Sequence, residues 1–134
     1  MRPRWARVIL GLILVAAVSG CSSSESLRLV ESDSSDNSGG AQALLQGTLI
    51  ADEDGCVRAQ AGGSAVTLVW PKGYTAHGKR DSFEIRDGSD KVVARSGRIL
   101  SIAGGSVDKF ADAWTERDCA DGSSLWIVGD ITTT

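Results

Sequence analysis

Short apolar runs separated by Gly, Asp and Pro follow one another at nearly even spacing from residue 44 onward. Such runs, bounded by turn residues, are typical of an all-β sandwich or barrel. Within residues 82–86 apolar and polar side chains alternate, so we expect Phe83 and Ile85 to face the core and Glu84 and Arg86 to face solvent. The pattern predicts strands at residues 44–51, 56–61, 65–70, 82–86, 91–95, 98–103 and 125–128.

One helix is expected in addition to the strands. Val107, Phe110, Ala111 and Trp114 recur at i, i+3, i+4 and i+7 after Ser106, a residue suited to a helix N-cap. We expect this helix to lie across an open end of the sheet. The predicted fold class is therefore mostly β, a small single-domain β-barrel or sandwich with one short helix before the last strand.

The segment of residues 21–42 differs in composition from the rest of the chain. It is rich in Ser and acidic residues, and its bulky apolar side chains are those of Leu27, Leu29 and Val30. Such a segment buries too little apolar surface to offset the entropy lost on ordering. We predict that residues 21–42 form a disordered tether, with a short strand at 27–30 as the alternative, and that residues 43–134 form a β-rich domain.

The first twenty residues have the pattern of an export signal. Three arginines within residues 1–7 precede the apolar run 8–18, which is too short to span a bilayer comfortably. We therefore expect residues 1–20 to be a signal peptide that forms no part of the folded domain.

The end of this signal, Val18-Ser19-Gly20-Cys21, resembles the bacterial lipobox, which has an aliphatic residue, two small residues and a cysteine. The resemblance implies that the Cys21 thiol receives a diacylglyceryl group and that acylated Cys21 becomes the first residue of the mature chain. It also implies an extracytoplasmic protein held on the cell membrane by its acyl chains. An ordinary secretory signal with a cysteine at the cleavage point is the alternative.

Charge and length narrow the function classes. The 134-residue chain has a net charge of −3, but three of its 14 basic residues lie in the signal, so the mature chain has 11 basic and 17 acidic residues and a net charge of −6. A general nucleic-acid-binding domain usually has a basic excess, so we expect no nucleic-acid partner. A domain of about 90 residues has a small core and gains much from a covalent cross-link.

Cys56 and Cys119 remain as a pair once Cys21 is acylated. In an oxidising compartment an even pair of cysteines favours one disulfide. A metal or redox pair is the alternative, but the chain has neither C-x-x-C spacing nor clustered histidines. We predict a Cys56–Cys119 disulfide.

The chain offers little material for catalysis. His77 is its single histidine, no G-x-S-x-G motif is present, and the carboxylates are scattered over turns. One histidine is too few for a zinc site. We expect no catalytic residues, no metal and no cofactor.

The segment 70–80 combines two aromatic residues with a basic cluster in an otherwise acidic chain. We interpret it as a loop whose side chains could contact a sugar, a phosphate or an acidic partner surface. In the alternative, Trp70 ends a core strand and the basic side chains are only solvated. The candidate contact residues are Trp70, Lys72, Tyr74, His77, Lys79 and Arg80.

Four short motifs in the domain occur in a fixed order: Gly55-Cys56, Trp70-Pro71-Lys72-Gly73, Gly104-Gly105 and Cys119. In this order the domain resembles small actinobacterial secreted or lipid-anchored proteins of uncharacterised function. An oligonucleotide/oligosaccharide-type barrel is a candidate architecture, although its helix follows the third strand, whereas the helix expected here precedes the last.

The sequence thus predicts a membrane-anchored module that binds an envelope protein, a glycan or an anionic surface. The alternative is a small envelope hydrolase or its accessory subunit. A cleft with convergent His and carboxylate side chains would favour the alternative.

Overall fold

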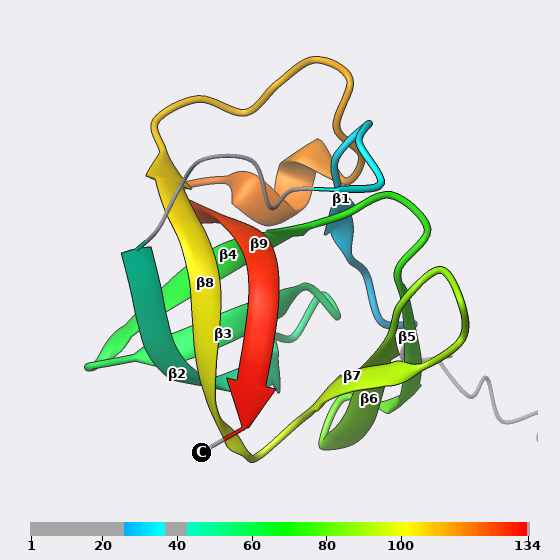
Figure 1. Ribbon diagram of the computed structural model, residues 1–134. Helices are drawn as coiled ribbons and strands as arrows, with labels where there is room; N and C mark the ends of the chain where they lie inside the picture. Colours follow the sequence, from blue (N-terminus) through cyan, green and yellow to red (C-terminus); the bar gives the residue numbers. More distant parts are fainter. Residues whose placement is uncertain (1–25, 37–42, 134) are drawn as a thin grey trace, which may run out of the picture.

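The structure is a computed structural model that describes residues 26–36 and 43–133, and its regular elements are nearly all strands (Figure 1). The predicted mostly β fold class is confirmed. Each predicted strand has a counterpart, although β8 and β9 extend four and five residues beyond the predicted ends at 103 and 128. The elements are β1 (Val30–Glu31), β2 (Ala43–Ala51), β3 (Val57–Ala61), β4 (Ser64–Trp70), β5 (Thr75–Lys79), β6 (Ser82–Arg86), β7 (Val92–Arg95), β8 (Ile99–Val107), the 3₁₀ turn η1 (Arg117–Ala120) and β9 (Ser124–Thr133).

Five strands close into a barrel in the order β4-β3-β2-β8-β9, and β9 returns to pair with β4. The β4–β9 pair is parallel, whereas the other four pairs are antiparallel. The first half of β2 pairs with β8 and its second half with β3, so this strand contributes to two sides of the barrel. Closure leaves few unpaired backbone groups on these strands.

The barrel core follows from strand alternation. Leu49, Ala59 and Leu68 from the first three barrel strands are at most 1 % exposed, and they pack with Leu100 and Ile102 from β8. Because successive side chains point to opposite faces of a strand, the residues between them lie on the outside. Trp70 also belongs to this core and is fully buried.

A second, three-stranded sheet, β5-β6-β7, packs beside the barrel (Figure 1). Phe83, Ile85 and Ala94 point inward and join the barrel core. Glu84 and Arg86 lie on the opposite face, as the alternation at residues 82–86 predicts. This second sheet therefore has one apolar, buried face and one charged, outward face.

Along the chain, the five barrel strands are β2, β3, β4, β8 and β9. The third (β4) and the fifth (β9) are parallel, and the first (β2) pairs with both the second (β3) and the fourth (β8). This is the connectivity of the oligonucleotide/oligosaccharide-type barrel. The β5-β6-β7 sheet lies between the third and fourth barrel strands, where that architecture has its helix. The connectivity describes the fold and carries no functional conclusion by itself.

The predicted short helix before the last strand is η1 (Arg117–Ala120), so the position predicted for it, from Ser106 to Trp114, is wrong. Ser106 and Val107 end β8 and pair with Trp126 and Leu125 of β9, so their backbone groups belong to the sheet. Phe110 and Trp114 pack instead against the disulfide cluster from the loop that leads to η1. Tertiary packing and strand pairing here override the helical spacing.

The predicted tether needs correction over residues 26–36, which pack on the domain. Val30 and Glu31 pair in parallel with Val69 and Trp70 of β4, and Val30 is only 2 % exposed. The apolar residues Leu27, Leu29 and Val30 bury enough surface to order this stretch. The remainder of the expected signal and tether, including Cys21, lies outside the described residues.

Candidate functional site

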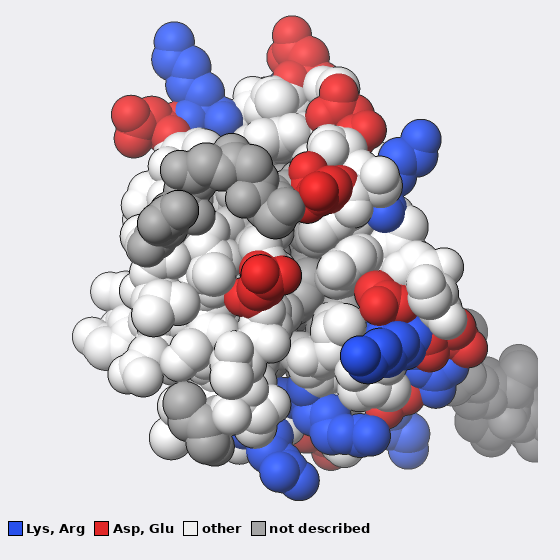
Figure 2. Space-filling model, viewed as in Figure 1, with Lys and Arg blue, Asp and Glu red and all other residues white. Residues whose placement is uncertain are grey.

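Positive charge is concentrated in one part of the chain. Residues 72–98 contain seven Lys or Arg and four Asp or Glu, a net charge of +3. The other described residues contain four Lys or Arg and twelve Asp or Glu, a net charge of −8. Figure 2 shows most of the blue side chains over the side where β6 and β7 lie, and an uncharged surface over β2 and β8. The domain is therefore electrostatically polarised.

The outward face of the β5-β6-β7 sheet carries much of this positive charge. Cross-strand pairing places His77 beside Glu84 and Glu84 beside Arg95, in one row across the three strands. Side chains two residues along a strand share the same face. We use the term basic face for the set His77, Lys79, Arg86, Arg95 and Arg98, with Glu84 at its centre.

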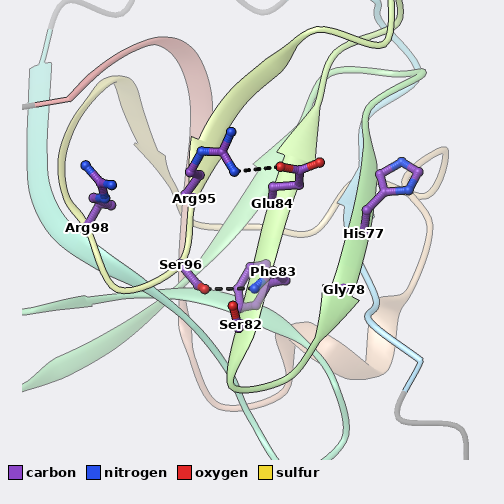
Figure 3. Close-up of a pocket in the computed structure, with 8 residues that line it drawn as sticks. All are labelled: His77, Gly78, Ser82, Phe83, Glu84, Arg95, Ser96 and Arg98. Carbon is purple, nitrogen blue, oxygen red and sulfur yellow. Dashed lines mark hydrogen bonds and ion pairs between the residues drawn. The ribbon is translucent and has the colours of Figure 1, made fainter.

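A shallow hollow of about 480 Å³ lies on the basic face (Figure 3). Arg95 and Arg98 stand on one side of it and His77 on the other. The hydroxyl oxygen of Ser96 accepts a hydrogen bond from the Phe83 N–H, 2.9 Å away, and the hydroxyl hydrogen can still be donated. The lining residues are His77, Gly78, Ser82, Phe83, Glu84, Arg95, Ser96 and Arg98.

Glu84 is the internal counter-anion of this face. Its Oε1 accepts hydrogen bonds from Nε and Nη2 of Arg86 at 2.9 and 2.6 Å, and its Oε2 accepts one from Nη1 of Arg95 at 2.8 Å. The hydrogen bonds from Arg86, assisted by the charge of Arg95, lower the pKa of Glu84. With Glu84 ionised, the four Lys and Arg residues of the basic face leave a net charge of +3.

The hollow is better suited to binding an anion than to proton transfer. A hydrolytic relay needs a carboxylate that orients the imidazole, but both oxygens of Glu84 are held by arginines. Nε2 of His77 lies 2.8 Å from the Thr75 hydroxyl on its own strand. By contrast, two arginine forks and a serine hydroxyl around one hollow are the donors that bind phosphate or carboxylate groups.

The structure separates the contact residues predicted from segment 70–80. Trp70 is buried, and the half-buried ring of Tyr74 lies 6.0 Å from it, so Trp70 is a core residue. Residues 75–79 form strand β5 rather than a loop, because they pair along their whole length with β6. His77 and Lys79 lie on the basic face, and Lys72 lies elsewhere, with its N–H donating to the Ser34 carbonyl.

Arg80, the last of the predicted contacts, donates from Nη1 to the Glu53 carbonyl at 3.1 Å, and so joins the β5–β6 turn to the β2–β3 turn. Arg86, Arg95 and Arg98 belong to the basic face but are not among the contact residues predicted from the sequence. The alternation at residues 82–86 is enough to place Arg86 on the outward face of its strand. Arg95 takes its position from the pairing of β7 with β6, and Arg98 lies in the turn between β7 and β8.

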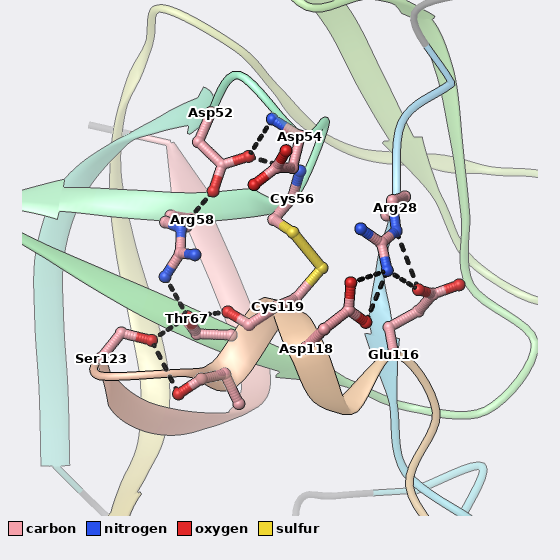
Figure 4. The surroundings of a disulfide bond; sticks show 11 residues. Arg28, Asp52, Asp54, Cys56, Arg58, Thr67, Glu116, Asp118, Cys119 and Ser123 are labelled. Atoms are coloured by element: carbon pink, nitrogen blue, oxygen red, sulfur yellow. Dashed lines mark hydrogen bonds and ion pairs between the residues drawn. A yellow bond between two sulfur atoms is a disulfide. The ribbon is translucent and has the colours of Figure 1, made fainter.

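The predicted Cys56–Cys119 disulfide is confirmed, with the two Cα atoms 5.6 Å apart (Figure 4). It links the start of β3 to η1, in a second buried cluster beside the barrel core. Nearby, Arg28 donates to the carboxylates of Glu116 and Asp118. The disulfide and these ion pairs together hold the first described residues of the chain against η1.

Glu116, Asp118 and Cys119 also place their ligand atoms within 4.8 Å of one another. A metal site there would need a free thiolate, but the sulfur of Cys119 is in the disulfide. Both carboxylates are bound by Arg28. This cluster is therefore structural.

Within the described part of the chain, no helix is long and apolar enough to cross a membrane. Comparison with known protein families, with curated proteins and with solved structures finds no match for this chain.

Proposed function

We propose that this chain is a lipid-anchored, extracytoplasmic binding module that uses its basic face to bind an anionic component of the cell envelope. The observation that carries this proposal is the hollow lined by Arg95, Arg98 and His77, on the positive side of an otherwise acidic domain. Guanidinium groups form paired, charge-assisted hydrogen bonds with phosphate and carboxylate oxygens. The ligand class is thus a phosphate or carboxylate group.

Support for the location comes from the sequence. The basic start, the apolar run and the small residues before Cys21 match a lipoprotein signal in order and spacing. The disulfide is consistent with an oxidising compartment, because such bonds are rare in the cytosol. Acylation of Cys21 would keep the module at the membrane surface.

The rigidity of the basic face supports binding rather than a merely solvated surface. Phe83, Ile85 and Ala94 fix the sheet against the barrel core, and so fix the strands from which His77 and Arg95 project. Preorganised side chains lose less entropy when a ligand binds. A small envelope hydrolase, the alternative function, would need a carboxylate free to orient His77, and Glu84 is engaged by arginines.

The proposal is tested by titrating the ¹⁵N-labelled mature chain, made with Cys21→Ser to prevent acylation, with inorganic phosphate. We expect amide shifts at Ser82, Arg95 and Arg98. The variant Arg95→Gln/Arg98→Gln should bind phosphate at least about tenfold more weakly, since it loses two charge-assisted donors.

The matched control is Lys72→Gln/Lys109→Gln, which removes the same charge from exposed positions outside the basic face. It should bind phosphate with nearly unchanged affinity. Equal weakening by the two double variants would mean that only net charge matters, and the assignment of the site would then be wrong.

A further inference from the structure

We infer that the anionic partner of the basic face is the phospholipid headgroup layer of the bilayer that holds the lipid anchor, so that the β5-β6-β7 sheet docks the domain on its own membrane. This inference rests on the proposed function and names its partner. It follows from the length of chain between the anchor and the domain, the point where that chain joins the domain, and the distribution of charge.

The chain between the anchor and the domain is short. Four residues, 22–25, separate Cys21 from Ser26, the first described residue. Even fully extended, five residue steps span at most about 18 Å. An acylated Cys21 therefore keeps Ser26 within about 18 Å of the lipid, and the domain surface around Ser26 stays close to the bilayer.

Ser26 lies at the β2–β3 turn. Its carbonyl oxygen packs so closely on Gly55 that a Cβ there would collide with it, and the Arg28 N–H donates to the Gly55 carbonyl at 2.7 Å. These contacts continue into β1, which pairs with β4. The position of the first described residues on the domain is thus determined by main-chain packing.

The same β2–β3 turn touches the end of the basic face. Nη1 of Arg80 donates to the Glu53 carbonyl, and Lys79 and Arg80 share a hollow of about 660 Å³ with Asp52 and Glu53. In Figure 1 the segment that leads to β1 passes on the side of the molecule where β5 lies. The basic face therefore begins close to the point where the chain joins the domain.

Charge selects which surface turns toward the bilayer. The basic face carries a net charge of +3, whereas the loop of residues 108–121 has five acidic and two basic residues, a net charge of −3. Figure 2 shows the acidic side chains of the loop region at one end of the view and most of the basic side chains at the other. An anionic bilayer attracts the basic face and repels the loop of residues 108–121.

The short linker and the charge act together. Each basic residue near an anionic surface favours the docked orientation by roughly fivefold, and the linker keeps the effective lipid concentration high. Attraction over this range decays with a Debye length of about 8 Å at physiological ionic strength. The docked orientation should therefore depend on anionic lipid and weaken in high salt.

The test uses the acylated mature protein in lipid nanodiscs that contain a gadolinium-labelled lipid headgroup. Paramagnetic relaxation enhancement is compared for amides of β5 to β7 and amides of residues 108–121. In discs with phosphatidylglycerol we expect strong enhancement on β5 to β7, at least about threefold above the loop, and loss of this contrast at 0.5 M salt. In discs of phosphatidylcholine the contrast should be much smaller.

Variant Arg95→Gln/Arg98→Gln should lose the contrast in anionic discs, while Lys72→Gln/Lys109→Gln keeps it. Equal enhancement in anionic and neutral discs, or enhancement centred on residues 108–121, would overturn the inference. The phosphate titration above separates the two proposals. If the unacylated chain binds phosphate at the hollow but the acylated protein does not dock, the proposed function stands and the membrane is not the partner.

Discussion

Glu84 and Arg95 face each other across strands β6 and β7, with Oε2 of the carboxylate 2.8 Å from Nη1 of the guanidinium. The other carboxylate oxygen is bound by Arg86. The side chain of Glu84 is 19 % exposed, so its charge is partly shielded from solvent, and it lines the hollow. Glu84 thus occupies arginine donors that an external anion would otherwise use, and it competes with the proposed ligand.

Replacing this internal counter-anion should strengthen anion binding. In Glu84→Gln the Nη1 donor of Arg95 is released beside the hollow, whereas Arg86 keeps its ion pair with Asp90. The net charge of the basic face rises from +3 to +4. We expect the affinity for phosphate to increase by about two- to fivefold, the size of effect seen for charges at partly exposed sites. The change is measured by the same NMR titration. Weaker binding would show that Glu84 positions the arginines rather than competing for them.

Part of this site follows from local sequence pattern and part does not. The alternation at residues 82–86 depends only on neighbouring residues, so it correctly places Glu84 and Arg86 on the outward face. Arg95 reaches the same row only because β7 pairs with β6 in the register that sets Arg95 opposite Glu84. Such non-local pairing is not visible in a single run of residues.

Two of the errors in secondary structure have the same origin. Strand β5, with the sequence TAHGK, has little intrinsic β preference, and its pairing with β6 makes it a strand. The apolar spacing from Val107 to Trp114 fits a helix, but Val107 ends β8, and Phe110 and Trp114 pack against the disulfide cluster from an irregular loop. In both cases a distant partner, rather than the local pattern, decides the conformation.

Removal of the disulfide should destabilise the domain strongly. The half-cystines are 63 residues apart, and constraining a loop of that length in the unfolded chain contributes about 4 kcal/mol. We expect Cys56→Ser/Cys119→Ser to melt about 16 to 32 °C lower than the parent, from about 4 to 8 °C per kcal/mol for a domain of this size. Calorimetry of the oxidised parent and the variant measures this. A decrease below about 5 °C would show that the folded contacts alone suffice.

Acid should weaken the fold through carboxylates that bind arginines. The hydrogen bond from Arg28 lowers the pKa of Asp118, and the hydrogen bonds from Arg86 lower that of Glu84. A carboxyl with a lowered folded-state pKa stabilises the fold above its unfolded pKa, and this stabilisation is lost as the pH falls through the folded value. Burial raises the pKa of Glu31, which acts in the opposite direction but is a single group.

We therefore expect a melting temperature that is nearly constant from pH 8 to about pH 5 and falls below about pH 4. The variant Arg28→Gln removes the partner of Asp118, so its melting temperature should be lower at pH 7 and should fall less steeply in acid. Circular-dichroism melting between pH 8 and pH 3 follows both proteins. An identical acid slope in the two would exclude the Arg28–Asp118 ion pair as a source of this pH dependence.

Gly104 should tolerate no side chain, because the backbone of β9 lies directly where its Cβ would be. Its φ is +153°, and a Cβ would collide with the Ile127 carbonyl oxygen and lie 2.9 Å from Nε1 of Trp126. The neighbouring atoms belong to a backbone and to a buried indole, so they have little room to move. We expect Gly104→Ala to cost about 3 kcal/mol or more of unfolding free energy, measured by urea denaturation.

Gly62→Ala is the matched control, since Gly62 also has a positive φ, +55°, but a Cβ there meets nothing within 4 Å. It should cost only about 1 to 2 kcal/mol, the penalty of a left-handed conformation alone. Similar losses for the two variants would mean that backbone conformation, and not the approach of β8 to β9, requires glycine at position 104.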